Sequence, residues 1–374
     1  MKRILVTAAG GPSSTSFIRS LKEVRSPDNP ITIDGYNYLL TDEYYIIGTD
    51  RGKYNVFRSE ADKTCLCPDA SHELYIPFLK HIIEKEQIDF MHSQPEAEIY
   101  VTGKHRDELM ETGVKMFMPK QETIELLRDK WKSYEVWRDA GIKVPKSFKI
   151  DGYDTLRTAF IELGKDLWLR ETIGAAGKGS LSRPRIEEAR IHLEKNKSYG
   201  RSMAAQHLTD KTITWQSIWY KGRLVVAQGR KRKYWAFSNR AQSGVTGLTG
   251  TGVTVSDPLL DEIAIDTVKA SDPEPHGIFS VDCCYDWDGV PNPTEINIGK
   301  FFTTHYFITR AGCNMPDIFV KLAFDEYDGP WEILNPCKPD MYWIRGIDCL
   351  PVLTDESAIY EVEKEYSQIL EAIR

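Results

Sequence analysis

Short apolar runs alternate with amphipathic stretches over about the first 118 residues. Runs rich in Ile, Leu, Val and Tyr predict strands, and apolar residues at helical spacing predict the helices between them. The predicted strands cover residues 3–8, 44–50, 88–91 and 115–118, and the predicted helices cover residues 13–24 and 73–85. Ser13, Ser14 or Thr15 is available as the N-cap of the first helix. This alternation predicts a parallel, doubly wound sheet.

The pattern changes after a predicted helix at residues 123–140, which ends at Gly141 with Pro145 beyond it. Strand-like stretches then dominate, at residues 147–150, 167–171, 203–207, 213–219, 223–228, 279–285 and 292–297. The segment 238–257 is rich in Gly, Ser and Thr and is predicted to be a mobile loop. Residues 356–374 have the period of an amphipathic helix. We therefore expect a mixed α+β organisation in the second half of the chain.

Length and charge narrow the class of protein. A chain of 374 residues predicts two or three domains, at roughly 150 residues each. The 48 basic and 55 acidic side chains give a net charge of −7. This balance argues against a general nucleic-acid binder, because such proteins neutralise phosphates with an excess of Lys and Arg. No apolar run reaches the roughly 18 residues of a membrane span, so we expect a globular, cytoplasmic protein.

The cysteines point to the same compartment. The chain has seven, an odd number that does not suit a disulfide framework. Cys65-x-Cys67 and Cys283-Cys284 lack the paired spacing and the nearby His of a structural zinc site. We interpret them as reduced, mostly structural thiols.

An acidic strand pair carries the sharpest chemical signal. Asp282 and Glu295 lie 13 positions apart (295 − 282) around the turn 286–289, so a hairpin brings them opposite each other. Period-two alternation then places Glu295 and Asn297 on one face. Three hard oxygen ligands on one face suit Mg²⁺. Judged from these three residues alone, a solvated hairpin with ordinary surface acids is an equally good interpretation.

A glycine-rich loop follows the predicted strand at 167–171. It reads Gly174-Ala-Ala-Gly-Lys-Gly-Ser180, so backbone N–H groups can approach an anion closely and Lys178 adds a charge. No Gly-Lys-Ser/Thr triplet opens a helix here, so the loop does not fit the Walker pattern. Taken alone, it is as well explained by a tight turn.

Two further features have competing interpretations. In the basic run 229–235, a strand places Arg230 and Arg232 on one face, and we expect that face to meet phosphates rather than nucleic acid. The opposite face then carries Lys231 and Lys233 into solvent. His305 follows the acidic strand pair closely and is either a base or, as we favour, a packing residue.

In their order along the chain, these motifs resemble those of ATP-grasp enzymes. The resemblance rests on Asp129-Lys130, Gly141-Ile-x-Val-Pro145, Arg170 before the glycine loop, Gln206-x-Leu208 and Asp282…Glu295-Ile-Asn297. The N-terminal residues 4–12 and the stretch 295–312 are most similar to the carbamoyl-phosphate-synthase large-chain-like branch. The resemblance covers residues 1 to about 325.

The resemblance implies an α/β plus α+β architecture, the ATP-grasp fold with an N-terminal Rossmann-like pre-ATP-grasp domain. We expect that domain at 1–118, a small lid subdomain with its connecting helix at 119–200, and a central metal and ATP subdomain at 201–330. Residues 331–374 are then a C-terminal extension packed on the central subdomain.

The resemblance also implies roles for individual residues. Cofactor-binding residues would be Lys130 and Arg170 at the phosphates, Gly174, Gly177, Lys178, Gly179 and Ser180 in the lid loop, and Gln206, His207 and Leu208 at the adenine. Asp282, Glu295 and Asn297 would hold one or two Mg²⁺, with Mn²⁺ as a substitute. Catalytic residues would be Lys300, Arg230 and Arg232, which would stabilise an oxyanion on the acyl carbon.

The chain departs from the family pattern at two positions. The family places an acid at the ribose about four residues after the adenine linker, where this chain has Thr212, with Asp210 nearby. After Glu-x-Asn the family commonly has Pro-Arg, and this chain has Ile298-Gly-Lys300. Lysine keeps the charge and loses the bidentate fork of arginine.

The expected activity is that of an ATP-dependent carboxylate–amine ligase that forms an acylphosphate and releases ADP and phosphate. Its partners would be a small-molecule carboxylate and an amine, with no nucleic acid and no membrane; a homodimer is compatible with this assignment. One alternative is carbamoyl-phosphate-synthase-like phosphorylation of bicarbonate or carbamate. Another is a catalytically silent nucleotide-binding module. The sequence does not identify the carboxylate or the amine.

Overall fold

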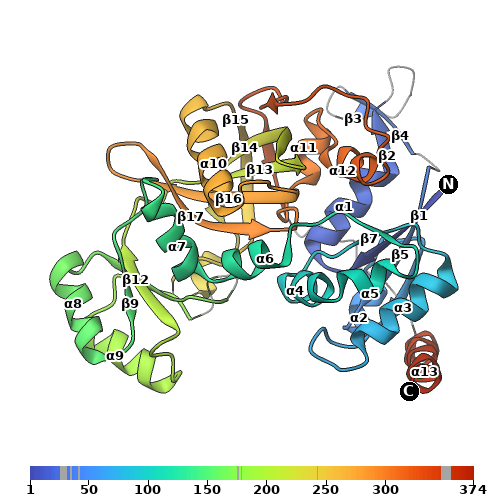
Figure 1. The fold of residues 1–374 in the computed structure, drawn as a ribbon, viewed down its shortest axis with the longest axis horizontal. Helices are drawn as coiled ribbons and strands as arrows, with labels where there is room; N and C mark the ends of the chain where they lie inside the picture. Colours follow the sequence, from blue (N-terminus) through green and yellow to red (C-terminus); the bar gives the residue numbers. More distant parts are fainter. Residues whose placement is uncertain are drawn as a thin grey trace.

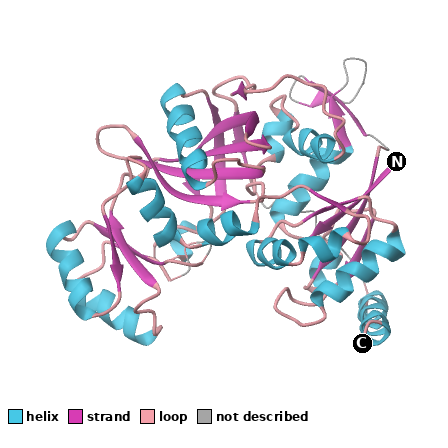
Figure 2. Ribbon diagram, in the orientation of Figure 1, coloured by secondary structure: helices cyan, strands magenta, loops and turns pink. Residues whose placement is uncertain are grey.

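The protein is described here as a computed structural model that covers residues 1–25, 32–33, 36–40, 43–174, 177, 179–241, 243–346 and 355–374. Figure 1 shows three parts along the long axis: an N-terminal α/β part, a central part built on a broad sheet, and a small part around β9 and β12. Helices flank the sheets in each part (Figure 2).

The N-terminal part is a parallel sheet in the order β6-β5-β1-β7-β8. Its strands are β1 Lys2–Thr7, β5 Tyr44–Asp50, β6 Lys63–Leu66, β7 Phe90–His92 and β8 Lys115–Met116. Its helices are α1 Pro12–Lys22, α2 Lys53–Val56, α3 Tyr75–Glu86, α4 Glu96–Lys104 and α5 Arg106–Met110. The predicted parallel, doubly wound sheet is confirmed. The backbone of β2 Glu23–Arg25, β4 Tyr36–Leu40 and β3 Thr32–Ile33 forms a separate small antiparallel sheet.

The start of α1 differs from the prediction. Gly11 is its N-cap and Pro12 its first residue, with no side-chain hydrogen bond at the cap. Proline suits this position because its missing N–H would have no partner there. Ser14 points elsewhere and donates its hydroxyl to the carbonyl of Thr7.

The connection to the rest of the chain is two helices where one was predicted. They are α6 Gln121–Arg128 and α7 Lys130–Asp139. The break is at Asp129, whose side chain accepts hydrogen bonds from the N–H groups of Trp131 and Lys132 and caps α7. The second helix ends at Asp139, with Ala140 as its C-cap and Gly141 following at φ +77°.

The small part is an antiparallel sheet in the order β11-β10-β12-β9, with two helices on it. Its elements are β9 Ser147–Ile150, α8 Tyr153–Leu163, β10 Leu167–Glu171, β11 Leu181–Ser182, α9 Ile186–Lys195 and β12 Ser202–Gln206. Because β12 pairs with both β10 and β9, this sheet extends past the boundary expected at residue 200.

The central sheet runs β17-β16-β13-β14-β15-β19, and β18 pairs with β14. Its strands are β13 Thr212–Tyr220, β14 Arg223–Trp235, β15 Thr249–Val255, β16 Gly277–Tyr285, β17 Pro291–Ile298, β18 Ile333–Leu334 and β19 Tyr342–Ile344. Helix α10, Pro258–Ser271, and helix α6 pack on one face. Helices α11 Tyr306–Arg310 and α12 Met315–Ala323 share a core with the other face and with α1.

Strand β15 corrects the prediction of a mobile loop over 238–257. Its glycines are explained by close packing rather than by a turn. A Cβ on Gly250 would lie 2.1 Å from the ring of Tyr234, and one on Gly252 would lie 3.1 Å from Cδ of Arg230. Side chains of β14 thus lie across β15 and leave no room for larger residues at these positions.

The C-terminal segment divides between two parts of the molecule. Strands β18 and β19 extend the central sheet, as expected for residues 331–374. Helix α13, Glu356–Ala372, instead packs on β6, α2 and α3 of the N-terminal part, with Ile369 buried there. The expected packing on the central subdomain is therefore wrong for α13. No helix in the described ranges is long and apolar enough to cross a membrane.

Candidate active site

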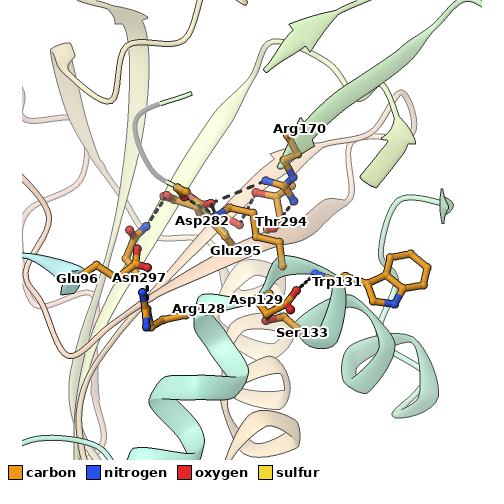
Figure 3. Close-up of polar contacts among 12 residues, drawn as sticks. Glu96, Arg128, Asp129, Trp131, Ser133, Arg170, Asp282, Thr294, Glu295 and Asn297 are labelled. Carbon is orange, nitrogen blue, oxygen red and sulfur yellow. Dashed lines mark hydrogen bonds and ion pairs between the residues drawn. The ribbon is translucent and has the colours of Figure 1, made fainter. Parts of the chain in front are cut away.

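The predicted acidic trio converges on one face of the β16–β17 hairpin (Figure 3). Asp282 lies directly opposite Glu295 in the antiparallel register. The amide of Asn297 donates to Asp282 Oδ2 at 2.9 Å. The hydroxyl of Thr214, on β13, donates to the other oxygen, Asp282 Oδ1. Asp282 is thus held in place from both sides.

A β-bulge in the hairpin turns a backbone carbonyl toward the same site. The register shifts between Asp282 and Cys283, so that Cys283 pairs with Pro293 and Thr294 is the extra residue. The carbonyl of Thr294 accepts a hydrogen bond of 2.8 Å from Nη2 of Arg170, which lies on β10 of the small sheet. The bulge therefore links the central sheet to the small one at the acidic face.

Two of the predicted phosphate-binding cations meet Glu295. Lys130 Nζ lies 3.4 Å and Arg170 Nη1 lies 3.8 Å from Glu295 Oε2. Lys130 is the first residue of α7, so the cap at Asp129 fixes where its side chain starts. Lys130 Nζ also donates to the carbonyl of Gly174 at 2.7 Å. The buried Nε of Arg170 has no hydrogen-bond partner.

The two carboxylates of the hairpin have opposite electrostatic surroundings. Burial, and then the charge of Glu295, raises the pKa of Asp282. Burial alone would raise the pKa of Glu295 as well, but Lys130, Arg170 and Lys300 outweigh it and hold that pKa below its usual range. Lys300 itself is half-buried. The arrangement favours an ionised carboxylate at the centre of a cationic cluster.

Arg230 and Arg232 lie on one face of β14, as predicted, and both reach Thr249 on β15. Arg230 donates to Thr249 Oγ1 at 2.6 Å and to Thr214 Oγ1 at 2.7 Å, so Thr214 connects it to Asp282. Arg232 donates to Thr249 Oγ1 at 3.0 Å and stacks on Trp235. Burial, and then the charge of Arg232, lowers the pKa of Arg230 to about 9. The buried Nε of Arg230 has no partner.

The predicted adenine-binding stretch lies at the end of β12. The His207 ring donates from Nδ1 to the Leu208 carbonyl at 2.6 Å and lies 3.0 Å from the Ser182 hydroxyl through Nε2. Both ring nitrogens are thus engaged within the chain. Leu208 is buried, and Gln206 is exposed. Thr212, which stands at the expected ribose position, accepts a hydrogen bond of 2.7 Å from Arg232.

The glycine-rich loop is described in part. Lys178, with Ala175 and Ala176, lies outside the described residues. Gly177 and Gly179 have positive φ angles of +67° and +71°, and the Gly179 carbonyl lies 3.0 Å from Nε2 of His192. The N–H of Ser180 donates to the Gly177 carbonyl at 3.2 Å, a tight turn.

His305 lies behind the site rather than in it. It is fully buried, and its Nδ1 donates to the Phe302 carbonyl at 2.9 Å. Burial lowers its pKa to about 3. Its ring packs against Phe301 with centroids 4.7 Å apart. These contacts match the packing role that the sequence favoured.

Sequence reasoning missed Thr214 and Thr249, which join the arginines to one another and to Asp282. Thr214 had a signal, because Thr212, Thr214 and Gln216 alternate along β13 and form a polar row on one face of a buried strand. Thr249 had none, since it lies in the segment that was predicted to be a loop. Within the described residues no three His, Cys, Asp or Glu side chains form a metal-holding group, so the candidate metal ligands are two carboxylates and an amide.

Comparisons with known proteins show which fold this protein has. The model of the PylC-like N-terminal domain matches residues 37–117. No curated protein matches the sequence significantly. The biotin carboxylase domain of Hydrogenobacter thermophilus 2-oxoglutarate carboxylase, solved as a dimer with MgADP, ADP and bicarbonate, is 15% identical with a TM-score of 0.66, over 91% of this chain and 73% of that chain.

Two ligases or synthetases share the same architecture. The N5-carboxyaminoimidazole synthetase of Staphylococcus aureus is 13% identical with a TM-score of 0.62, over 87% of this chain and 78% of that one. The L-amino acid ligase of Bacillus licheniformis is 12% identical with a TM-score of 0.62, over 91% and 78%. The chain has the ATP-grasp fold. The parallel N-terminal sheet and the acidic hairpin are those that the sequence predicted.

Proposed function

We propose that this ATP-grasp protein is an ATP-dependent ligase that activates a small carboxylate as an acylphosphate and joins it to an amine. The observation that carries the proposal is the meeting of four elements at Glu295. The central hairpin supplies Glu295 and Asp282, α7 supplies Lys130, and β10 supplies Arg170. A triphosphate needs such a combination of cations and metal-binding oxygens, because phosphoryl transfer depends mostly on positioning and charge neutralisation.

The residues present fit a divalent cation. Asp282, Glu295 and Asn297 offer hard oxygen ligands on one face, the donor set that Mg²⁺ takes together with waters and phosphate oxygens. The charge of Glu295 helps to raise the pKa of Asp282, and a bound cation would relieve this repulsion. These three residues would hold one or two Mg²⁺, which would neutralise charge on the β- and γ-phosphates.

The nucleotide would lie between the small sheet and the central sheet. Lys130 and Arg170 would bind its phosphates, and the partnerless Nε of buried Arg170 is a donor ready for such an oxygen. The loop with Gly174, Gly177, Gly179 and Ser180 would cover the phosphates. Gln206 and Leu208 would line the adenine, with His207 holding the Leu208 carbonyl in place.

Two displacement steps follow from this placement. A carboxylate oxygen of the substrate attacks the γ-phosphorus of ATP, the bond to the β-phosphate oxygen breaks, and ADP leaves. The amine nitrogen then attacks the acyl carbon, loses a proton, and expels phosphate as the C–O bond breaks. Arg230, Arg232 and Lys300 would neutralise the substrate carboxylate and the oxyanion that forms on its carbon.

The fold neighbours support this class of reaction without identifying the substrates. Two are named as a synthetase and an L-amino acid ligase, and one was solved with MgADP. The same neighbour was solved with bicarbonate and as a dimer, which keeps bicarbonate phosphorylation as the second candidate activity and a homodimer as the assembly to test. We propose domains of residues 1–118, 119–206 and 207–330, which places β12 in the small subdomain.

The test is ADP release by the purified protein with Mg²⁺ and ATP, against a panel of carboxylates paired with amines and against bicarbonate alone. The proposal expects ADP release that requires both a carboxylate and an amine, with a coupled product detected by mass spectrometry. Release with bicarbonate alone would favour the second activity. ATP binding without ADP release under any pair would contradict both and would leave a silent nucleotide-binding module.

A further inference from the structure

The segment that carries Lys300 is held by two buried glutamine side chains from different parts of the molecule. It follows β17 as a turn in which Gly299 has a φ of +70°, and it runs through Phe301 and Phe302. Gln94 and Gln216, which hold it, are 3% and 0% exposed. A buried glutamine is unusual unless its amide is used, because each unpaired buried polar group costs free energy.

Gln216 holds the segment from the central sheet. Its Oε1 accepts the N–H of Phe302 at 3.0 Å, and its Nε2 donates to the carbonyl of Lys300 at 3.3 Å. Ser280, on β16, binds both groups. Its hydroxyl accepts a hydrogen bond from Gln216 Nε2 and donates one of 3.2 Å to the Lys300 carbonyl. The backbone on both sides of Phe301 is thus tied to strands β13 and β16.

Gln94 holds the same segment from the N-terminal part. It follows β7, and its Oε1 accepts the N–H of Phe301 at 3.0 Å, with a longer contact of 3.5 Å from its Nε2 to the Phe301 carbonyl. His92 Nε2 donates to the same Oε1 at 2.9 Å and so fixes the amide orientation. The His92 ring stacks on Phe17 of α1, with centroids 4.4 Å apart.

We propose that Gln94 and Gln216 are positioning residues that hold the backbone of residues 300–302 and so set the place of the Lys300 side chain. The inference deepens the proposed function and rests on it. Three consecutive residues have their backbone groups held from both sides, so the Cα of Lys300 has little freedom. In the proposed function, Lys300 neutralises the oxyanion that forms on the acyl carbon, so its position bears on the rate. Through Gln94 the N-terminal part then contributes to the reaction without touching the substrate.

Near-isosteric methionine variants test this, because they remove the amide bonds and keep the volume. We expect Gln94→Met and Gln216→Met each to lower kcat for ADP release by roughly tenfold, with the KM for ATP changed by less than about twofold. Lys300→Met lowers kcat at least as much. Each double variant with Lys300→Met has the kcat of Lys300→Met alone, because the glutamines act through that lysine.

Gln228→Met is the matched control. Gln228 faces Gln216 in the β13–β14 register, is also fully buried, and also binds backbone groups, at Val255 and Cys337. It should lower the unfolding temperature to a similar degree and leave kcat within about twofold. Multiplicative losses in the double variants, a Lys300→Met variant with unchanged kcat, or an equal loss of kcat in Gln228→Met would each overturn the inference.

A second measurement separates this inference from the proposed function. If the wild-type protein releases no ADP with any substrate pair, the proposed function fails, and the clamp is then judged by the rate of amine-selective labelling at Lys300, measured by mass spectrometry relative to Lys2. The inference expects that rate to change severalfold in Gln216→Met and not in Gln228→Met. Equal rates in all three proteins would overturn it. Should Gln94→Met not fold, Gln216→Met carries the same test.

Discussion

Glu295 is the residue at which charges from three parts of the fold meet. Lys130 and Arg170 lie within 3.4 and 3.8 Å of it, and Lys300 acts on it from the segment beyond β17. An ionised carboxylate is therefore stable there although it is half-buried. The same residue is a proposed metal ligand. Its charge would therefore pair with the cationic side chains in the free protein and with the metal ion in the nucleotide complex.

Replacing Glu295 with Gln keeps the shape and removes the charge. We expect the turnover of ADP release to fall by roughly 100-fold or more, because a neutral amide is a poor ligand for Mg²⁺. The far-ultraviolet circular dichroism should stay unchanged. Glu274→Gln, at an exposed carboxylate that pairs with Lys120, is the control and should keep wild-type turnover. Near-wild-type turnover in Glu295→Gln would remove the metal assignment.

Glu98 makes the N-terminal part sensitive to pH. Burial raises its pKa from 4.5 to about 7, against a hydrogen bond from Thr7, and its Oε2 has no partner of ordinary hydrogen-bond geometry. The folded state holds the Glu98 proton more tightly than the unfolded chain does. The contribution of protonated Glu98 to the free energy of unfolding is therefore complete below about pH 4.5. This contribution, about 3 kcal/mol in total, is lost as the pH rises through 7.

Urea unfolding of the wild type and Glu98→Gln across pH 5 to 8 measures this effect. The wild type should lose free energy of unfolding relative to the variant as the pH rises. The comparison cancels the contributions of His92, His276 and His305, whose lowered pKa values act with the opposite sign below pH 6.5. Parallel pH profiles for the two proteins would show that the Glu98 carboxyl does not titrate in this range.

At the scale of elements, the start of α7 decides where Lys130, the proposed phosphate-binding lysine, lies. Asp129 caps the helix by accepting from the N–H of Trp131 at 3.0 Å, and Lys130 is the next residue. We expect Asp129→Ala to cost about 1 kcal/mol of stability and also to raise the KM for ATP. Asp355→Ala removes the cap of α13, far from the site, and should cost a similar amount with no change in KM. An unchanged KM in Asp129→Ala would contradict the placement of Lys130.

The elements also show how far the sequence reaches. Four strands and two helices of the N-terminal part follow from local periodicity, whereas β6, α2, α4 and α5 were not predicted. The acidic hairpin follows from spacing, so Asp282, Glu295 and Asn297 were predictable as a group. Strand β15 was not, because its glycines reflect the side chains of Tyr234 and Arg230 packed across it. The break at Asp129 was also hidden, since apolar periodicity continues through both helices.

At the scale of the whole molecule, contacts between distant segments could not be predicted from local sequence patterns. Gln94 meets Phe301 across 207 positions, and α13 returns from the C-terminal end to pack on β6. A chain of net charge −7 also gathers Lys130, Arg170, Arg230, Arg232 and Lys300 around one acidic hairpin. We therefore expect a small anion rather than a polyanion to bind this cluster.

Ligand-dependent thermal stability tests that statement. Mg-ATP at about 100 times its Kd should stabilise the folded state by about 2.7 kcal/mol and raise the unfolding temperature by a few degrees. Arg170→Met should lose most of this shift, because its guanidinium reaches the hairpin at Thr294. Duplex DNA at the same charge concentration should give no shift. A larger shift with DNA than with Mg-ATP would contradict the reading of the cationic cluster.

The transfer of oxygen from the carboxylate to phosphate tests the central claim most directly. With the substrate carboxylate labelled with ¹⁸O, attack on the γ-phosphorus places one labelled oxygen between carbon and phosphorus. Displacement by the amine then releases that oxygen in inorganic phosphate. Acylphosphate chemistry at the Asp282–Glu295 hairpin predicts phosphate carrying one ¹⁸O for each amide formed. Unlabelled phosphate, with the label retained in the product, would contradict it.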